Sequence, residues 1–366
     1  MHEPSFRNVL ILTTLLSTSP CAWAADDLYV DGSKGGTLEK ALAQLPARID
    51  RDVTIHIKGN LAGPKGEGES LGLSHPMREG RRVRIIGEGD TSILSWTAGD
   101  EPLVLVTQGR WSLENLQIGT RQKGQRRGVR VTGPGVVELH DVRIRTASQS
   151  APGLHATRSG LAELFGKIEL NEDLHEKAEG ETFTGIEADY GGVVRFRERE
   201  KASLSIGNGS LSASYYGVIE LGCAEARVTS WHEQANVIAV NNSGRVDFHS
   251  TKATLAARNP RNTTIGLEHD GHVLAEGAPI ILRGFDNGNA IVLQKASTFF
   301  CNDVTFAGSF RTPLSAMSGS TLLIGVNGDL GGGEVLTGAR IILEKCTGKL
   351  AQPVSAGSQG CFIDVR

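Results

Sequence analysis

Four side chains that suit acid–base chemistry stand at matching positions of a sequence repeat. Each lies three or five residues before a glycine, and the four are Arg130, His155, Glu187 and Asp189. In a lyase, a base removes the proton next to a carboxyl group while a cation stabilises the enolate that develops. His155 or Arg130 could serve in this chemistry, so the four residues are the predicted catalytic site. An ordinary salt-bridged surface is the alternative interpretation of the same residues.

A column of charged residues lies three positions after the small residue of successive repeat units. Its members are Glu138, Glu163, Arg195, Glu220 and Asp247. Like charges that face each other cost stability, so cations, a bound metal or solvent must offset the four carboxylates. One hypothesis is a solvated face balanced by arginines. The other is a carbohydrate cleft in which these residues bind substrate, with paired carboxylates acting as acid and base or holding Ca²⁺ against a uronate. Ca²⁺ is therefore a candidate cofactor, and the sequence assigns no metal ligands.

A basic run lies between two of the repeat units, and its sequence contains no acidic residue. Its cations are Arg121, Lys123, Arg126 and Arg127, followed by Arg130. Such a run is either a solvated turn or a clamp for an acidic glycan or another polyanion. We include the first four cations among the predicted substrate-binding residues.

The repeat that positions these residues is defined by small marker residues, with apolar residues six and four before each marker and two and four after it. The markers are Gly109, Gly135, Gly160, Gly192, Gly217, Gly244, Gly271, Ser297 and Ser320. Alternating apolar residues predict half-buried strands, and a small residue between them lets the chain turn. A unit of about 25 residues made of strands cannot bury its apolar face alone, so neighbouring units must stack.

This stacking pattern resembles the right-handed parallel β-helix of the pectate-lyase-like superfamily over roughly residues 50 to 345. The predicted fold class is all-β, a single-stranded right-handed parallel β-helix solenoid with an N-terminal capping helix. An antiparallel sandwich also has short alternating strands, but it does not keep one register through nine units. The resemblance concerns the fold, because the catalytic motifs of these enzymes are missing. For example, the segment 258–261 has the wrong spacing for Arg-x-Pro-x-x-Arg.

The chain divides into four predicted segments. These are a signal peptide (1–24), an N-terminal strand and capping helix (25–58), the parallel β-helix (59–335) and a C-terminal rung and cap (336–366). The signal peptide combines Arg7, an apolar run and a small-x-small site ending at Ala24. We therefore expect cleavage after Ala24 and a periplasmic or secreted protein without membrane insertion. Leu38, Ala41, Leu42 and Leu45 predict one apolar helix face that covers the open end of the solenoid.

The cysteines give two further expectations. Cys223 and Cys301 fall on inward columns and are predicted to be buried thiols. Cys346 and Cys361 could form a disulfide in an oxidising compartment or remain free.

The expected function is the binding of an extended, acidic polysaccharide, with depolymerisation or modification by a polysaccharide lyase if the protein is an enzyme. The alternative is a non-catalytic surface protein, an adhesin or a tail-fibre-like scaffold. A net charge of −3 and a pI near 6.4 give no general attraction to nucleic acid. A groove beside either cluster would favour catalysis, whereas a flat face would favour adhesion. Oligomeric state is left open.

Overall fold

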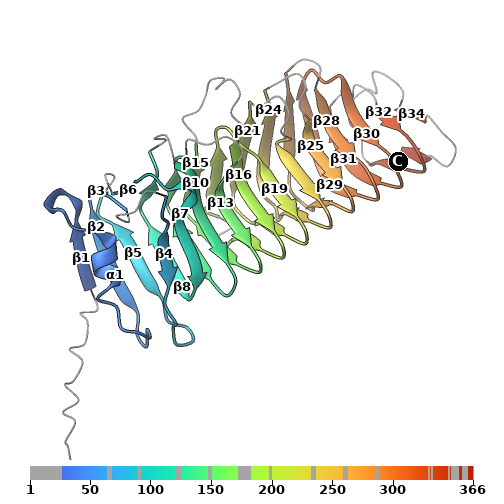
Figure 1. Cartoon of the computed structure of the whole chain (residues 1–366). Helices are drawn as coiled ribbons and strands as arrows, with labels where there is room; N and C mark the ends of the chain where they lie inside the picture. Colours follow the sequence, from blue (N-terminus) through green and yellow to red (C-terminus); the bar gives the residue numbers. More distant parts are fainter. Residues whose placement is uncertain are drawn as a thin grey trace, which may run out of the picture.

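The chain forms a parallel β-solenoid, the parallel β-helix fold, in which strands stack along one long axis (Figure 1). In this computed structural model the described residues are 27–63, 68–89, 92–120, 125–146, 151–171, 183–197, 200–231, 236–258, 263–285, 288–328, 330, 333–344, 347, 354–356 and 362–365. Every strand pairing within these ranges is parallel and joins a strand to one in the next turn of the solenoid. We call one such turn a rung.

Each complete rung contributes one strand to sheet I and two strands to sheet II. The 12 strands of sheet I are β4 (Leu71–Ser74), β7 (Gly99–Gln108), β10 (Gln125–Thr132), β13 (Ala151–Thr157), β16 (Phe183–Asp189), β19 (Leu211–Ser214), β22 (Ile238–Asn241), β25 (Thr263–Glu268), β28 (Asn289–Leu293), β30 (Thr312–Ala316), β32 (Gly333–Val335) and β34 (Val354–Ala356).

Sheet II has 23 strands and wraps around the rest of each rung. They are β1 (Asp27–Asp31), β2 (Val53–Lys58), β3 (Asn60–Leu61), β5 (Val83–Gly87), β6 (Ile93–Leu94), β8 (Arg110–Glu114), β9 (Gln117–Ile118), β11 (Val136–His140), β12 (Arg143–Ile144), β14 (Leu161–Phe165), β15 (Lys167–Leu170), β17 (Val193–Phe196), β18 (Ser203–Ile206), β20 (Val218–Leu221), β21 (Glu225–Ser230), β23 (Arg245–Phe248), β24 (Lys252–Ala257), β26 (His272–Ala275), β27 (Ile280–Gly284), β29 (Thr298–Gly308), β31 (Thr321–Asn327), β33 (Arg340–Glu344) and β35 (Phe362–Val365).

The inward columns predicted from the repeat form the core. From Val129 to Leu314, the residues six before each marker are at most 1% exposed, and the residues two after each marker, from Trp111 to Leu322, are all fully buried. Because these residues stack in register, each rung buries its apolar side chains against the next. Cys223 and Cys301 lie in this core as predicted, and burial raises the pKa of Cys301 to about 12.

The predicted register is wrong in the first marked unit. Val129 pairs with Val104 rather than with Leu103, and Leu105 faces outward beside Arg130. The bend that follows β7 is one residue shorter than the bend that follows β10, since three positions separate Val106 from its marker and four separate Val131 from its own. A shift of one residue exchanges the two faces of a strand.

Two kinds of strand were also missed by the repeat. The second sheet II strand of each rung is often only two residues long, as in β9 and β12, which is too short to show alternation. The Gly-rich stretch before residue 80 contains β4, whose Leu71 and Leu73 are buried.

The bends after sheet I are built differently from the expectation. From Gly160 to Ser320, the two residues before each marker adopt the left-handed conformation, whereas markers such as Gly192 and Gly217 have ordinary backbone angles. These glycines are needed because a Cβ atom would lie 2.2 Å from the carbonyl oxygen of Ala156 and 2.0 Å from that of Ala188. The marker is therefore small because the neighbouring rung is close.

The N-terminal strand and helix lie beside each other at one end of the solenoid (Figure 1). The helix α1 (Leu38–Leu42) begins after Thr37, whose side chain accepts a hydrogen bond from the Lys40 amide, and a short 3-10 helix η1 (Gly32–Lys34) precedes it. All four residues of its predicted apolar face are buried. The C-terminal strands β33, β34 and β35 continue the two sheets. The predicted signal peptide and Cys346 and Cys361 lie outside the described residues, within which no helix is long and apolar enough to span a membrane.

Candidate functional site

The outward face of sheet I brings the four predicted catalytic residues together. His155 in β13 pairs in register with Arg130 in β10 on one side and with Glu187 in β16 on the other. Asp189 lies two residues beyond Glu187 on the same face of β16, and its register partner is Thr157. Stacked strands lie about 4.8 Å apart, so side chains from three rungs share one small region. We call His155, Glu187 and Asp189 the sheet I cluster.

His155 is buried although it faces outward, whereas Glu187 and Asp189 are half-buried. His155 is 7% exposed, and its Nε2 lies 3.1 Å from Oδ1 of Asp189. Apart from this contact, neither ring nitrogen of His155 has a hydrogen-bond partner among the described residues, and the same holds for Oδ1 of Asp189 and Nε of Arg130. Buried polar atoms without partners are uncommon in folded proteins, so this group requires an explanation beyond stability.

The electrostatic environment disfavours charge on two members of the cluster. Burial lowers the pKa of His155, and the charges of Arg130 and Arg127 add to this effect while Asp189 opposes it. Burial also raises the pKa of Glu187, and the neighbouring Asp189 carboxylate raises it further. The folded protein therefore holds a neutral imidazole and a carboxyl group that resists ionisation side by side, an arrangement that suits proton transfer.

A separate hollow lies on the outward face of sheet I, two to four rungs beyond Glu187. Glu187 pairs in register with Ser212, which is followed in later rungs by Ala239 and Gly266. The hollow measures about 250 Å³, lies over β22, β25 and β28, and is lined in part by Ala239, Gly266 and Glu268. The next outward column carries Ser214, Asn241 and Glu268, which are polar.

Three of the chain's four tyrosines occupy the bends that follow β16 and β19, and the apolar repeat does not reveal them. Tyr190 directly follows Asp189, and its ring stacks on Tyr215 of the next rung at a centroid distance of 4.8 Å. Tyr190, Tyr215 and Tyr216 are 58%, 45% and 72% exposed, and all three have positive φ. Other rungs place polar residues there, such as Asn242 and Asp270. Aromatic residues in bend positions are the sequence signal that could have identified them.

The predicted acidic column is an ion-paired network on the outward face of sheet II. Glu138 binds Arg82, at 2.9 Å from Nη1, and also Arg110. Glu163 binds Arg195, at 2.8 Å, together with Arg110 and Arg197. We call this network the sheet II ladder.

The ladder is balanced by arginines, but its carboxylates are buried instead of solvated. Glu138, Glu163 and Asp247 are 2%, 1% and 3% exposed. Burial raises the pKa of Glu138, but the nearby imidazole of His140, the hydrogen bond from Arg110 and the charge of Arg82 overcome it and lower the pKa to about 2. All four carboxylate oxygens of Glu138 and Glu163 already accept bonds from arginine, so Ca²⁺ would have to displace these cations.

The remaining ladder residues are less tightly held. Asp247 forms an ion pair with Arg245 at 2.7 Å, and Glu220 has no ion-pair partner among the residues that the structure describes. Glu220, Asp247 and His249 nevertheless bring one possible ligand atom each within 4.8 Å of one another, as do the three residues of the sheet I cluster.

The predicted basic clamp is only partly placed. Arg127 lies in β10, two rungs from Glu187, and its charge lowers the pKa of His155. Arg121 and Lys123 lie outside the described residues, as does the side chain of Arg126. The substrate-binding role of all four cations stays a prediction.

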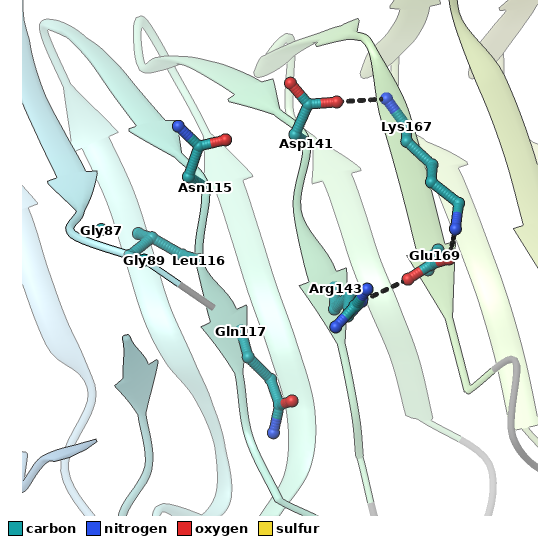
Figure 2. A pocket seen from close by; sticks show the side chains of 9 residues that line it. All are labelled: Gly87, Gly89, Asn115, Leu116, Gln117, Asp141, Arg143, Lys167 and Glu169. Carbon is teal, nitrogen blue, oxygen red and sulfur yellow. Dashed lines mark hydrogen bonds and ion pairs between the residues drawn. The ribbon is translucent and has the colours of Figure 1, made fainter. Parts of the chain in front are cut away.

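A further hollow of about 300 Å³ lies on sheet II, where each rung bends between its two strands (Figure 2). Its charged residues are satisfied by one another. Glu169 is held by Arg143 and Lys167, and the Lys167 amide donates to Asp141 at 2.8 Å. This hollow offers a ligand fewer unpaired groups than the sheet I cluster does.

Comparison with known proteins adds no relative. No protein-family model matches the chain, and neither the curated proteins nor the solved structures yield a match.

Proposed function

We propose that this chain is an exported protein that binds an extended acidic polysaccharide along the outward face of sheet I and cleaves it by β-elimination at the sheet I cluster. The observation that carries the proposal is a buried imidazole, unpaired except for its approach to Asp189, beside two arginines on the outward face of stacked strands. A face of stacked rungs matches a linear polymer, whose sugar units repeat along one direction.

Each group has a role in this reaction. Arg127 and Arg130 bind the uronate carboxylate and stabilise the negative charge that develops on it as the enolate forms. His155 takes the proton from the carbon next to the carboxyl group, and Asp189 orients the imidazole. The bond to the leaving glycosidic oxygen then breaks, that oxygen gains a proton, and a carbon–carbon double bond remains in the sugar.

The tyrosines supply the binding platform. Tyr190 directly follows Asp189, and Tyr215 and Tyr216 lie in the bend of the next rung. The three exposed side chains present ring faces on which sugar rings can stack.

The architecture of the proposal includes three further parts. The solenoid is right-handed, because connections between parallel strands of one sheet are right-handed in about 98% of cases. The helix α1 caps the N-terminal end and prevents edge-to-edge association there. The segment 1–24 is a signal peptide that directs the protein to the periplasm or the exterior.

The test measures ultraviolet absorbance of the conjugated product while the mature protein, treated with chelator, is incubated with a panel of uronate polymers. Absorbance is expected to rise with at least one polymer, and His155→Ala is expected to slow the rise at least about 100-fold. His249→Ala is the matched control, because His249 lies on sheet II, and it is expected to react like the parent protein. A reaction that is unchanged in His155→Ala would refute the role of the cluster.

A hydrolase is the second candidate, because the raised pKa of Glu187 beside Asp189 is the arrangement in which one carboxyl group acts as acid and its neighbour as base or nucleophile. New reducing ends without ultraviolet absorbance would identify hydrolysis. Retained binding without either product would leave the non-catalytic surface or tail-fibre-like scaffold.

A further inference from the structure

We propose that His155, Glu187 and Asp189 form a site for one divalent transition-metal ion, with Zn²⁺ as the reference ion. This inference goes beyond the proposed function and does not depend on it, because metal binding is measured without a glycan.

The geometry brings three ligand atoms of two types to one point. One ring nitrogen and one oxygen from each carboxylate lie within 4.8 Å of one another, and Nε2 of His155 is 3.1 Å from Oδ1 of Asp189. Ligands at about 2.1 Å from a tetrahedral Zn²⁺ lie about 3.4 Å apart. Small rotations of the Glu187 side chain are enough to reach that arrangement.

The second observation is the absence of other partners for these atoms. The side chain of His155 is 10% exposed, and within the described ranges neither of its nitrogens makes a hydrogen bond. Oδ1 of Asp189 is also buried, and apart from its contact with His155 it has no hydrogen-bond partner among the described residues. A buried polar atom without a partner carries a desolvation cost that a coordinated ion would remove.

The donor set selects the class of ion. Imidazole favours Zn²⁺ and its neighbours in the first transition row, whereas Ca²⁺ and Mg²⁺ prefer oxygen ligands alone. Two carboxylates balance the charge of a divalent ion, and three protein ligands leave a position for water or another ligand. Arg130 and Arg127 act in the opposite direction, because their charges reach this site and repel a cation.

A second group on the ladder has the same residue types and provides an internal comparison. Glu220, Asp247 and His249 are equally close together, but Asp247 is already bound by Arg245 and His249 is exposed. Its ligand atoms are either paired or solvated, so this group is expected to bind no ion.

Metal binding and base catalysis at His155 exclude each other, since a neutral imidazole has one free lone pair and coordination of an ion by Nε2 leaves Nδ1 protonated. If both proposals hold, Zn²⁺ inhibits elimination and a chelator restores it.

The experiment is a calorimetric titration of the chelator-treated mature protein with Zn²⁺, without glycan. One ion per chain is expected to bind. His155→Ala and Glu187→Gln are each expected to weaken binding at least about 10-fold, while His249→Ala leaves it unchanged. Arg130→Gln is expected to strengthen binding, because it removes a repelling charge, although the same variant is expected to slow elimination.

Circular dichroism first establishes that each variant is folded. If His155→Ala does not fold, Glu187→Gln still tests whether the cluster binds the ion. The absence of saturable Zn²⁺ binding to the parent protein would overturn the inference. So would binding that survives both cluster variants or that is lost in His249→Ala. Because elimination is measured on chelated protein, failure of either proposal leaves the other standing.

Discussion

The two outward faces of the solenoid differ in how completely their buried charged groups are paired. On sheet II, Glu138 and Glu163 are buried, and every carboxylate oxygen accepts a bond from an arginine. On sheet I, the side chains of His155 and Asp189 are 10% and 14% exposed, and apart from their contact with each other their buried atoms have no partner among the described residues. Both clusters place ionisable residues at fixed positions of one repeat.

The difference shows that residue type and position do not by themselves determine a role. A saturated network has no free donor or acceptor for a ligand, and its charges stabilise one another. An unsatisfied network imposes a cost that is relieved by a substrate, a proton or an ion. The sheet II ladder is therefore a saturated network, whereas the sheet I cluster leaves polar atoms that a ligand could satisfy, which is why we propose it as the binding site.

Acid is expected to produce the largest effect, and it should act through the ladder. The folded-state pKa of Glu138 is lowered from 4.5 to about 2, so its stabilisation is fully present above about pH 4.5 and is lost as the pH falls towards 2. The pKa values of Glu114 and Glu163 are lowered in the same sense. Urea unfolding measured at a series of pH values should show falling stability across this interval. Constant stability between pH 4.5 and 2 would mean that the ladder is not ionised and paired as described.

The same substitution on the two faces should separate them. Glu163→Gln leaves Arg110, Arg195 and Arg197 around a neutral side chain and is expected to cost about 2 kcal/mol, since these arginines are partly exposed and water offsets part of the loss. Glu187→Gln is expected to cost nothing or to stabilise slightly, because burial disfavours its charge. Urea unfolding of both variants at neutral pH is the measurement. Equal losses would refute the contrast between the faces.

Relief of backbone strain should change the free energy of unfolding less than Glu163→Gln does, and should raise it rather than lower it. Tyr215 has φ +47°, and the equivalent residue of the next rung is Asn242. Because asparagine adopts this left-handed conformation more readily than tyrosine, Tyr215→Asn is expected to stabilise the protein by about 1 kcal/mol. The same variant should bind a uronate polymer more weakly, because it removes one ring of the stacked pair. Thermal unfolding and a pull-down measure the two effects, with Asn242→Ala as control. A loss of stability without a loss of binding would make the tyrosines purely structural.

The smallest effect is expected within the ladder itself. Glu220 lies in the ladder's column but makes no ion pair with the residues that the structure describes, so Glu220→Gln should change stability by less than about 0.5 kcal/mol. Comparison with Glu163→Gln in the same unfolding assay tests whether arginine contacts, rather than membership of the column, determine the cost. A loss similar to that of Glu163→Gln would indicate a cooperative network.

Sequence periodicity predicted the inward columns because alternating apolar residues can all face the core of a stacked solenoid in only one register. It failed at Leu105, where a bend one residue shorter reverses the face without changing the alternation. The same periodicity predicted that Arg130, His155 and Glu187 lie on one face, and the strand pairing confirms this, because register depends on spacing alone.

The partners of these columns were not predictable from register. Arg110 and Arg245 lie one residue after a marker and Arg197 lies five after, so their contacts depend on how long side chains cross between rows. The burial of Glu138 and the stacking of Tyr190 on Tyr215 depend likewise on side-chain directions. Sequence spacing predicts the position of a residue in the solenoid, whereas side-chain packing determines its contacts.

The in-register pairing also determines where the chain tolerates changes in length. Twelve residues lie between Leu170 and Phe183, yet β13 and β16 pair without a shift from Leu154 and Ile186 to Thr157 and Asp189. Insertions in such connections leave every column intact, whereas one residue inserted within β16 before Glu187 would turn that side chain towards the core. Loops of this solenoid can therefore diverge or be exchanged while the positions of its functional side chains are preserved.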